Sequence, residues 1–426
     1  MSVNAVKNFE LLVITITSIL LISVIVVYAE PITINPKFVV EKIFTGHFEP
    51  SSMAFLSADD LIVLDRDEGK VFRITDGVQS QPLLDVNVAT SGYRGLLGVA
   101  ISTNQKNVPQ VFLYFTEARI HDGDDATKNP LNPLGNRLYR YDLVDNKLVN
   151  PRLLLDLPAQ PGPRHAGGKV AIGPDKNLYV TIGDLDGTFR FKQYETKAQN
   201  YWNGVTPDGR SGILVVSQDG KPVGKGILGA IFPLNLYYAY GIRNSFGIDW
   251  DPVSRYLWDS ENGPTFGDEL NLVLPGFNGG WANVQGFWKP NVENMGRVNL
   301  EPKDLVNFNG QGTYSPPKFV WLNPAAPSAV KFLNSDKYSP QYKDDLFVGD
   351  ANNGYVYDFN LDQQRRNLNL SGKLSDKIAN NTMELNDVIF AKGFGKVADM
   401  EIGPDGYLYV LSSQKQLVSI YRIGLR

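Results

Sequence analysis

The feature that most constrains the fold of this chain is a short segment that occurs twice. Residues 172–180 read IGPDKNLYV and residues 402–410 read IGPDGYLYV. In each copy Gly-Pro-Asp is a turn signal, because proline fixes φ and aspartate bonds its own backbone, and Leu-Tyr-Val then alternates like a strand. Each copy is therefore predicted to form a β-hairpin, and a recurring hairpin predicts a repeat architecture.

Weaker copies of this hairpin fill much of the remaining chain. They lie at residues 53–63, 97–101 with 111–114, 246–252 with 256–258, and 329–332 with 345–348. Most copies continue into a further alternating segment, as at 69–74, 136–141, 354–359 and 417–422. Because a propeller blade consists of successive antiparallel strands, we expect an all-β fold, a six-bladed β-propeller of four-stranded antiparallel blades. A blade formed by both ends of the chain would close it.

Composition supports one folded domain and narrows its chemistry. Hydrophobic residues make up 43% of the chain and no Pro/Ser-rich linker divides it, so we expect a single domain over residues 30–426. Cysteine is absent, which excludes disulfides, thiolate metal sites and cysteine nucleophiles. The net charge is -4 and the basic residues are scattered, which argues against nucleic-acid binding.

The first residues have the pattern of an export signal. Lys7 precedes an uncharged apolar run over residues 11–28, and VYA at 27–29 fits a signal-peptidase site. The run is also long enough for a membrane anchor. We therefore expect residues 1–29 to be a signal peptide or an N-terminal membrane anchor, and the rest of the chain to be extracytoplasmic, either secreted or held at the outer face of the membrane.

A histidine-containing loop is the first candidate for catalysis. The chain holds three histidines, and His165 lies in RHAGG at residues 164–168, a stretch with little bulk to bury it. Neutral imidazole accepts a proton near neutral pH if a carboxylate orients it, and Asp184 follows the next predicted strand pair. A general base is therefore one interpretation of His165. A solvated loop histidine is the other.

A second loop carries a cation beside an amide. Arg243 and Asn244 lie in YGIRNSFGI at residues 240–248, at the start of the fourth repeat. A guanidinium suits an anionic partner such as a carboxylated cofactor or a developing oxyanion. The alternative is that both side chains hydrogen-bond the loop backbone.

A third loop is rich in oxygen ligands. It reads ENGPTFGDELN at residues 261–271. A Gly-Pro turn exposes carbonyl oxygens, and the acidic and amide side chains around Gly263 and Pro264 make a site suited to Ca²⁺. Solvated surface is the alternative.

Two further stretches imitate binding motifs. DGDD at residues 122–125 looks like a calcium loop, but it lacks the spacing and the terminal glutamate of an EF-hand. GKGILG at residues 224–229 matches G-x-G-x-x-G, but no βαβ unit surrounds it. Both are interpreted as loops. NLS at 369–371 and NNT at 380–382 fit the glycosylation pattern.

The order of the three candidate loops resembles that of a known family. H-x-G-G, G-x-R-N-x-x-G and E-x-G-P-x-x-x-D-E-L-N follow one another as in the soluble quinoprotein glucose/sorbosone dehydrogenases, and GLLG at residues 95–98 is a further match. The likeness extends from residue 38 to residue 426. It implies an enzyme that requires pyrroloquinoline quinone (PQQ) and Ca²⁺, oxidises the C1 hydroxyl of an aldose sugar to a lactone, and passes electrons to an external acceptor.

The resemblance also implies a role for each matching residue. His165 would be the base, Asp184 its supporting carboxylate, and Arg243 the cation beside the quinone oxygen that gains charge. The carbonyl oxygens of Gly263 and Pro264 would hold Ca²⁺. The residues implied in cofactor binding are Arg243, Asn244, Asn262, Asp268, Asn352 and Lys396.

The chain departs from the family where the cofactor carboxylates would bind. Asn352 stands where the family has a lysine, and Lys396 and Ala398 stand where it has two arginines. Each charge-assisted hydrogen bond removed costs roughly 1.5–3 kcal/mol, so weaker cofactor binding is expected. Tyr93 replaces a glutamine before GLLG, and PAAPS at residues 324–328 keeps only part of a Pro-Ser loop. Substrate contacts are therefore expected to differ.

Two functions from other classes stay open. One is a propeller that has lost the cofactor and serves as an extracellular binding module, which Asn352, Lys396 and Ala398 motivate. The other is a calcium-dependent lactonase. It needs a set of Glu, Asn and Asp residues converging on one axial metal, and the sequence does not single out such a set.

Overall fold

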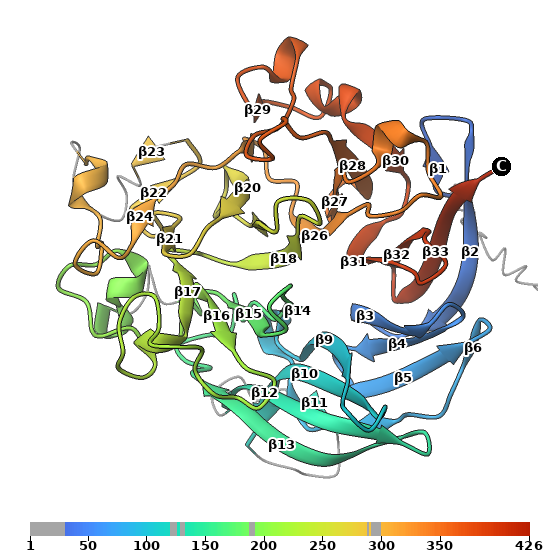
Figure 1. Cartoon of the computed structure of the whole chain (residues 1–426), viewed down its shortest axis with the longest axis horizontal. Helices are drawn as coiled ribbons and strands as arrows, with labels where there is room; N and C mark the ends of the chain where they lie inside the picture. Colours follow the sequence, from blue (N-terminus) through green and yellow to red (C-terminus); the bar gives the residue numbers. More distant parts are fainter. Residues whose placement is uncertain (1–29, 120–125, 128–132, 187–191, 288, 291–299) are drawn as a thin grey trace, which may run out of the picture. The chain divides into compact units, whose positions relative to one another are not determined.

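The structure, a computed structural model, describes residues 30–119, 126–127, 133–186, 192–287, 289–290 and 300–426. Two sequence predictions, the leader at residues 1–29 and the loop at 122–125, lie outside these ranges. Residues 31–426 form one unit of β-strands (Figure 1). Helical residues in the described part occur only as short 3-10 turns: η1 (Ser91–Tyr93), η2 (Lys192–Tyr194), η3 (Lys197–Gln199), η4 (Leu234–Leu236), η5 (Pro302–Asp304), η6 (Pro340–Tyr342), η7 (Gly372–Leu374) and η8 (Glu384–Asp387).

Three sheets take their innermost strands, β3, β9 and β14, from the first half of the chain. The first contains β3 (Pro50–Ser57), β4 (Asp60–Asp65), β5 (Lys70–Thr75), β6 (Val78–Gln79) and β7 (Leu84–Asp85). The second contains β8 (Val88–Ala89), β9 (Leu96–Thr103), β10 (Pro109–Ala118), β11 (Ala126–Thr127), β12 (Pro133–Val144) and β13 (Lys147–Leu157). The third contains β14 (Val170–Ile172), β15 (Leu178–Ile182), β16 (Gly212–Val216), β17 (Tyr237–Tyr240), β21 (Phe277–Asn278) and β24 (Thr313–Tyr314).

Three more sheets and a small ribbon complete the described strands. The fourth sheet contains β18 (Ser245–Trp250), β19 (Leu257–Glu261), β20 (Asp268–Val273), β25 (Phe319–Trp321) and β29 (Ile378–Ala379). The fifth contains β1 (Ile32–Thr33), β26 (Pro327–Phe332), β27 (Leu346–Asp350), β28 (Tyr355–Phe359) and β30 (Ile389–Lys392). The sixth contains β2 (Phe38–His47), β31 (Lys396–Ile402), β32 (Leu408–Gln414) and β33 (Leu417–Leu425), and the ribbon pairs β22 (Val284–Gln285) with β23 (Lys289–Pro290).

Every copy of the repeated segment forms the predicted antiparallel strand pair. In the two strongest copies Ile172 pairs with Leu178, and Ile402 pairs with Leu408. The weaker copies form β3–β4, β9–β10, β18–β19 and β26–β27. The hairpin prediction is therefore confirmed along the whole repeat.

The sheets stand around a common centre, as Figure 1 shows. Their innermost strands contact one another in a closed ring, in the order β3, β9, β14, β18, β26, β31 and back to β3. The sixth sheet joins the two ends of the chain, since β2 pairs with β33 from Phe38 opposite Leu425 to His47 opposite Leu417. The predicted propeller class is confirmed, and the two ends share a sheet as expected.

The prediction of uniform four-stranded antiparallel blades is wrong in its detail. Among the described residues only the sheet that joins the chain ends has four strands; the other five large sheets have five or six, and the β22–β23 ribbon has two. Several pairs at the outer edges are parallel: β8 with β11, β17 with β21, β21 with β24, and β25 with β29. Long loops return along these edges and add strands of two or three residues, which are too short to show an alternating sequence pattern.

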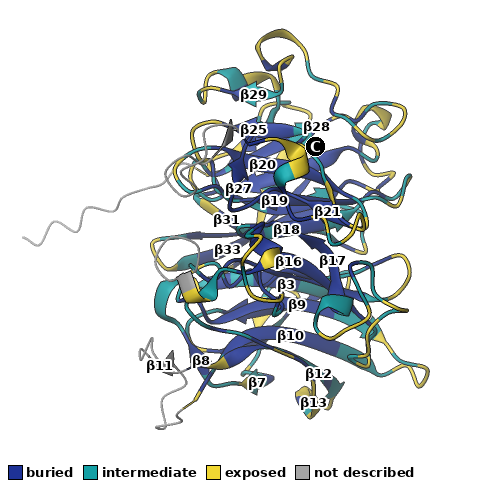
Figure 2. Cartoon of the chain, turned by 90° about the vertical axis from the view of Figure 1, so that its left-hand side faces the viewer, coloured by how far each residue is buried: buried dark blue, intermediate teal, exposed yellow. Residues whose placement is uncertain are grey.

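Apolar side chains fill the spaces between neighbouring sheets. Strands β4, β15 and β20 are buried along their whole length, and Figure 2 shows buried strands throughout the interior. Between the first and sixth sheets, for example, Leu61 and Val63 pack with Leu411 and Ile420. Burial of this surface, at roughly 25 cal/mol per Å², is the main term that favours the folded state.

A buried ion network links innermost strands on opposite sides of the ring. Lys169, just before β14, lies 2.5 Å from Asp399 of β31 and 3.6 Å from Glu401. Lys331 of β26 lies 2.9 Å from Glu401 and 3.5 Å from Asp249 of β18. Because buried charges are tolerated only when they are paired, this network stabilises one arrangement of the ring.

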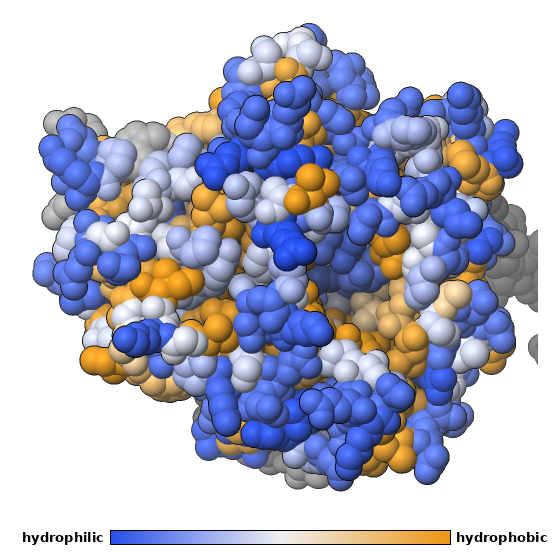
Figure 3. Space-filling model, viewed as in Figure 1, coloured by the Kyte–Doolittle hydropathy of each residue, from blue (hydrophilic) through white to orange (hydrophobic). Residues whose placement is uncertain are grey.

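The face of the propeller that Figure 3 shows is mostly polar. Apolar residues form smaller groups on it. Within the described ranges, no helix combines the length and apolar character needed to cross a bilayer.

Candidate active site

The structure brings His165 and Asp184 into direct contact. His165 lies in the loop before β14, Asp184 follows β15, and Nδ1 of the imidazole is 2.6 Å from Oδ1 of the carboxylate. The intervening glycines make this possible, because a Cβ at Gly167 would lie 2.4 Å from the Thr181 carbonyl oxygen. With Nδ1 bound to Asp184, Nε2 is the imidazole nitrogen left for another partner.

The side chain of Trp281 binds the same carboxylate. Its indole Nε1–H donates to Asp184 Oδ2 at 2.9 Å, and the backbone N–H of Asp186 donates to Oδ1 at 2.9 Å. Asp184 is 1% exposed, so these bonds replace water. The sequence analysis missed Trp281, and its only signal was general: a buried indole N–H usually has an acceptor.

Arg243 lies over the same indole. Its guanidinium carbon is 5.5 Å from the centre of the Trp281 ring, and Nη1 donates to the carbonyl oxygens of Asn262 (2.8 Å) and Gly263 (2.9 Å). Burial lowers the pKa of Arg243, and the charges of Asp184 and other nearby carboxylates, including Glu261, oppose that shift. The backbone of Arg243 is also fixed, because its N–H donates to Glu261 Oε1 (2.6 Å) and its C=O accepts from the Asp184 N–H (2.9 Å).

The Gly263–Pro264 bend is held by Asp268. One carboxylate oxygen accepts from the Gly263 N–H and the other from the Ala326 N–H, both at 2.7 Å. Burial raises the pKa of Asp268 to about 6, although these backbone donors oppose the rise. Position 263 requires glycine, because a Cβ there would lie 2.2 Å from the Phe266 carbonyl oxygen.

The donors near this bend suit a hard cation. Asn244, Asn262 and Gly263 line one cavity, and Oδ1 of Asn244 is buried without a hydrogen-bond partner. Oxygen donors of this kind fit Ca²⁺, provided that Arg243 releases the carbonyl oxygens it now binds. No group of three or more His, Cys, Asp or Glu side chains in the described part of the chain could hold a metal.

Two adjacent cavities meet at these residues. The first, of about 310 Å³, is lined by His165, Arg243, Asn244, Gly263 and Asp268. The second, of about 320 Å³, is lined by Asn352 and Lys396. Shared walls join the two cavities, and they are formed by Tyr93, Gly167, Phe246, Asn262 and Ala326.

Most of the site residues proposed from the sequence line one of these cavities. Two do not. Asp184 lies behind His165, and Pro264 is absent from both walls.

The second cavity has cations that the sequence analysis did not identify. Arg66 and Lys169 line it beside Lys396. Arg66 is already bound to Asp67 at 2.8 Å, and Lys169 belongs to the buried ion network. These two positive charges are therefore largely neutralised, and their positions could not be found from sequence because each comes from a different sheet.

Comparison with known proteins identifies the family. The family model described as Glucose / Sorbosone dehydrogenase matches residues 47–421. The aldose sugar dehydrogenase of Escherichia coli is 27% identical over 397 residues, which is 91% of this chain and 92% of that protein. Quinoprotein glucose dehydrogenase B of Acinetobacter calcoaceticus is 29% identical over 256 residues, which is 56% of this chain and 51% of that protein.

A solved structure shares the fold. It is the PQQ-bound form of aldose sugar dehydrogenase from Streptomyces coelicolor, with a TM-score of 0.63 and 22% identity, covering 93% of this chain and 100% of that one. The relatives are named as dehydrogenases, which assigns the chain to the oxidoreductases that act on small sugars. The family match covers nearly the whole propeller, and we conclude that this chain belongs to the glucose/sorbosone dehydrogenase family.

Proposed function

We propose that this chain is an exported aldose dehydrogenase that uses PQQ and Ca²⁺ and forms a lactone. The observation that carries the proposal is the contact between His165 and Asp184 beside a cavity that Arg243 also lines. An oriented imidazole and a fixed guanidinium facing one space can remove a proton and stabilise negative charge at the same time.

His165 is the proposed base. Asp184 accepts the Nδ1–H bond, which leaves the lone pair of Nε2 free to take the proton of the C1 hydroxyl. The O–H and C1–H bonds of the sugar break and a C1=O bond forms. The proton goes to Nε2, and the C1–H electron pair leaves as hydride, so that a cyclic aldose becomes a lactone.

The remaining residues hold the oxidant and stabilise charge. When bound, PQQ supplies the two-electron oxidant, Ca²⁺ polarises it, and an external acceptor takes the electrons afterwards. Asn244, Asn262, Asp268, Asn352 and Lys396 are the proposed cofactor contacts, and the bend at Gly263 and Pro264 is the proposed calcium ligand. Arg243 would place its positive charge beside the oxygen that becomes negative.

Three structural and cellular points belong to the same proposal. Each of the large sheets is counted as one blade, which gives a six-bladed propeller. Residues 30–426 act as one domain. Residues 1–29 are a signal peptide or an anchor, so the propeller works outside the cytoplasm.

Reconstitution tests the function directly. Purified protein is mixed with PQQ and Ca²⁺, and aldose-dependent reduction of a dye is measured. We expect turnover that disappears when calcium is chelated. Absence of turnover with every aldose, together with absence of retained PQQ, would contradict the proposal.

The second candidate is a binding module without cofactor. It is favoured by the neutralised cations of the second cavity and by Asn352, whose Nδ2 donates to the Pro324 carbonyl oxygen at 2.9 Å. Calorimetry with PQQ and Ca²⁺ separates the two candidates. Binding at micromolar affinity or tighter supports the dehydrogenase, and no detectable binding supports the module.

A further inference from the structure

Trp281 contacts two charged groups of the proposed acid–base site, Asp184 and Arg243. It follows β21 and is fully buried. Its backbone N–H donates to the Gly241 carbonyl oxygen at 3.0 Å, and its C=O accepts from Asn200 Nδ2 at 2.9 Å. The indole is therefore held at its backbone as well as by packing, and it has one fixed orientation toward Asp184.

We propose that Trp281 is the positioning residue of this site: its indole N–H holds Asp184 in the orientation that binds His165, and its ring supports Arg243. The proposal deepens the proposed function and rests on it for the roles of His165 and Arg243. Trp281 itself would touch neither sugar nor cofactor, since it lines neither cavity.

The first part of the proposal follows from the two oxygens of Asp184. Oδ1 is 2.6 Å from His165 Nδ1, and Oδ2 accepts the Trp281 N–H at 2.9 Å. A carboxylate bound on both oxygens cannot rotate about its Cβ–Cγ bond without breaking one of these contacts. The imidazole is therefore kept in the orientation that leaves Nε2 for the substrate.

The second part follows from the surroundings of Arg243. The guanidinium lies over the indole face, and its Nε is buried without a hydrogen-bond partner. An aromatic face attracts a cation, and tryptophan does so most strongly. The ring therefore holds the guanidinium on the side from which Nη1 reaches the carbonyl oxygens of Asn262 and Gly263.

Other buried tryptophans show that burial alone does not explain this contact. Trp258 and Trp321 are 0% and 1% exposed, yet Nε1 of each has no hydrogen-bond partner. Trp281 is equally buried, and its N–H meets the carboxylate of the acid–base pair. Trp258→Phe is therefore a matched control for Trp281→Phe.

Titration of the histidines by NMR tests the proposal in cofactor-free protein. Loss of the N–H donor concentrates negative charge on Asp184, which strengthens its attraction for a protonated imidazole. In Trp281→Phe the titration midpoint of His165 should rise by about 0.5 pH units or more. The other charged residues that line the cavity with His165, namely Arg164, Arg243 and Asp268, are not substituted in this variant. Trp258→Phe should leave the midpoint in place.

An unchanged midpoint in folded Trp281→Phe, or an equal rise in Trp258→Phe, would overturn the proposal. If Trp281→Phe does not fold, ¹⁵N-indole spectra of the unsubstituted protein decide. The Nε1–H resonance of Trp281 should then move with the His165 titration, while that of Trp258 should not. A static Trp281 resonance refutes the proposal. The histidine titration and the indole spectra do not require turnover. A failure of the proposed function would appear in the dye-reduction assay and not in these two measurements.

Discussion

The two strongest copies of the repeated segment have the same internal structure in different surroundings. In the first copy Asp175 accepts a bond from the Tyr179 hydroxyl at 3.0 Å, and in the second Asp405 accepts one from the Tyr409 hydroxyl at 2.8 Å. Both aspartates also accept a backbone N–H two residues later at 3.1 Å. Local sequence therefore determines the hairpin in both places.

The two copies differ in the side chains that lie just before and just after the hairpin. Aligned on Ile-Gly-Pro-Asp, Asp184 of the first copy corresponds to Gln414 of the second, and Lys169 corresponds to Asp399. Asp184 binds His165, whereas the second copy has Gln414 and Gly395 at these two positions and so lacks both the carboxylate and the imidazole. Lys169 and Asp399 bind each other across the ring. The repeat thus supplies a scaffold, and function depends on a few positions where the copies diverge.

The largest expected effect is on activity, when the carboxylate that only the first copy carries is removed at Asp184. In Asp184→Asn the amide donates to Nδ1, which places the proton on Nε2 and abolishes the base. We expect kcat of the reconstituted enzyme to fall on the order of 10³-fold or more. Gln414→Asn, at the equivalent position, should keep full activity. Equal activity of the two variants in a dye-reduction assay would contradict the assigned role of Asp184.

The next largest effect is expected on stability, at the ion pair that joins the copies. Lys169→Met leaves the Asp399 carboxylate buried with one fewer cation, which should lower the free energy of unfolding by about 3 kcal/mol. Adding Asp399→Leu should restore part of that loss, because the unpaired charge is removed. Lys343→Met, which removes an exposed pair with Asp336, is the control and should not change the urea midpoint. A loss in Lys169→Met no larger than that in this control would refute a structural role for the network.

Sequence reasoning succeeded where structure is local. Turn chemistry at Gly-Pro-Asp and strand alternation predicted both hairpins, since each depends on residues within one turn. The outer strands were not predicted correctly, because β21 and β29 have two residues each and depend on the loops that carry them. The sequence also predicted that Asp184 would orient His165, because the two residues flank the same predicted strand pair.

Contacts between distant segments were beyond reach of the sequence. Trp281 reaches Asp184 because β21, which precedes Trp281, pairs with β17 in the third sheet. Arg66 and Lys169 reach one cavity from separate sheets, so neither spacing nor composition relates them. The bond from Arg243 to the Gly263 carbonyl oxygen was likewise unforeseen, because it depends on which rotamer a long side chain adopts inside a fold.

A smaller effect tests the turns themselves. Lys176 and Gly406 occupy equivalent positions with φ of 64° and 84°. A Cβ at Gly406 would lie 2.9 Å from Ser335 Oγ, and left-handed backbone costs a residue with a Cβ roughly 1 kcal/mol. Gly406→Ala should therefore destabilise by about 1–2 kcal/mol, whereas Lys176→Ala should change little, since Lys176 already carries a Cβ. The free energies of unfolding of both variants are measured in urea. Equal losses in Gly406→Ala and Lys176→Ala would contradict the prediction.

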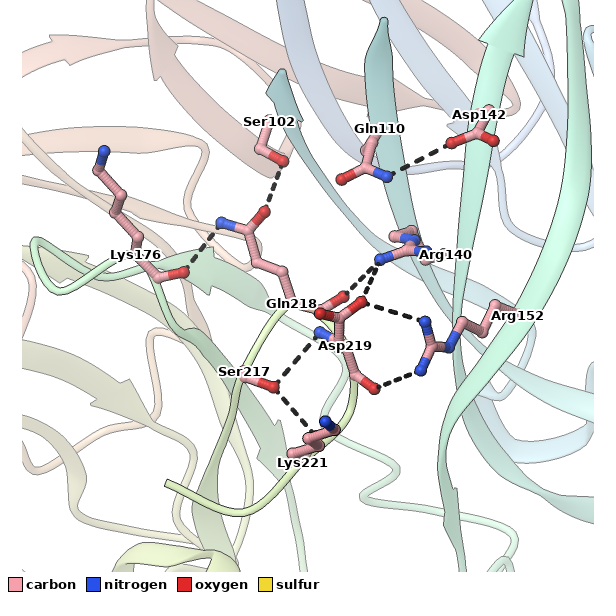
Figure 4. Close-up of polar contacts among 10 residues, drawn as sticks. All are labelled: Ser102, Gln110, Arg140, Asp142, Arg152, Lys176, Ser217, Gln218, Asp219 and Lys221. Atoms are coloured by element: carbon pink, nitrogen blue, oxygen red, sulfur yellow. Dashed lines mark hydrogen bonds and ion pairs between the residues drawn. The ribbon is translucent and has the colours of Figure 1, made fainter. Parts of the chain in front are cut away.

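The smallest effect is expected at the loop that contacts the turn of the first copy, residues 173–177. Figure 4 shows Gln218 reaching the Lys176 carbonyl oxygen, a bond of 2.9 Å, beside Asp219. Asp219 lies 2.7 Å from Arg140 and 3.1 Å from Arg152, and it is 56% exposed. Exposed pairs contribute roughly 0–1 kcal/mol and are screened by salt, so Asp219→Asn should cost less than Gly406→Ala and nothing in high salt.

The pH dependence of that small loss has a definite sign. Arg140 holds the pKa of Asp219 below its ordinary value of 3.8. A carboxylate with a lowered pKa in the folded state stabilises above its unfolded pKa, and this contribution is lost as the pH falls through the folded value. The difference between Asp219→Asn and the parent should therefore be present at pH 7 and vanish in strong acid. In the second copy the corresponding Gly406 carbonyl oxygen is held by the neutral Ser335 hydroxyl at 2.5 Å, so Ser335→Ala should show neither salt nor pH dependence.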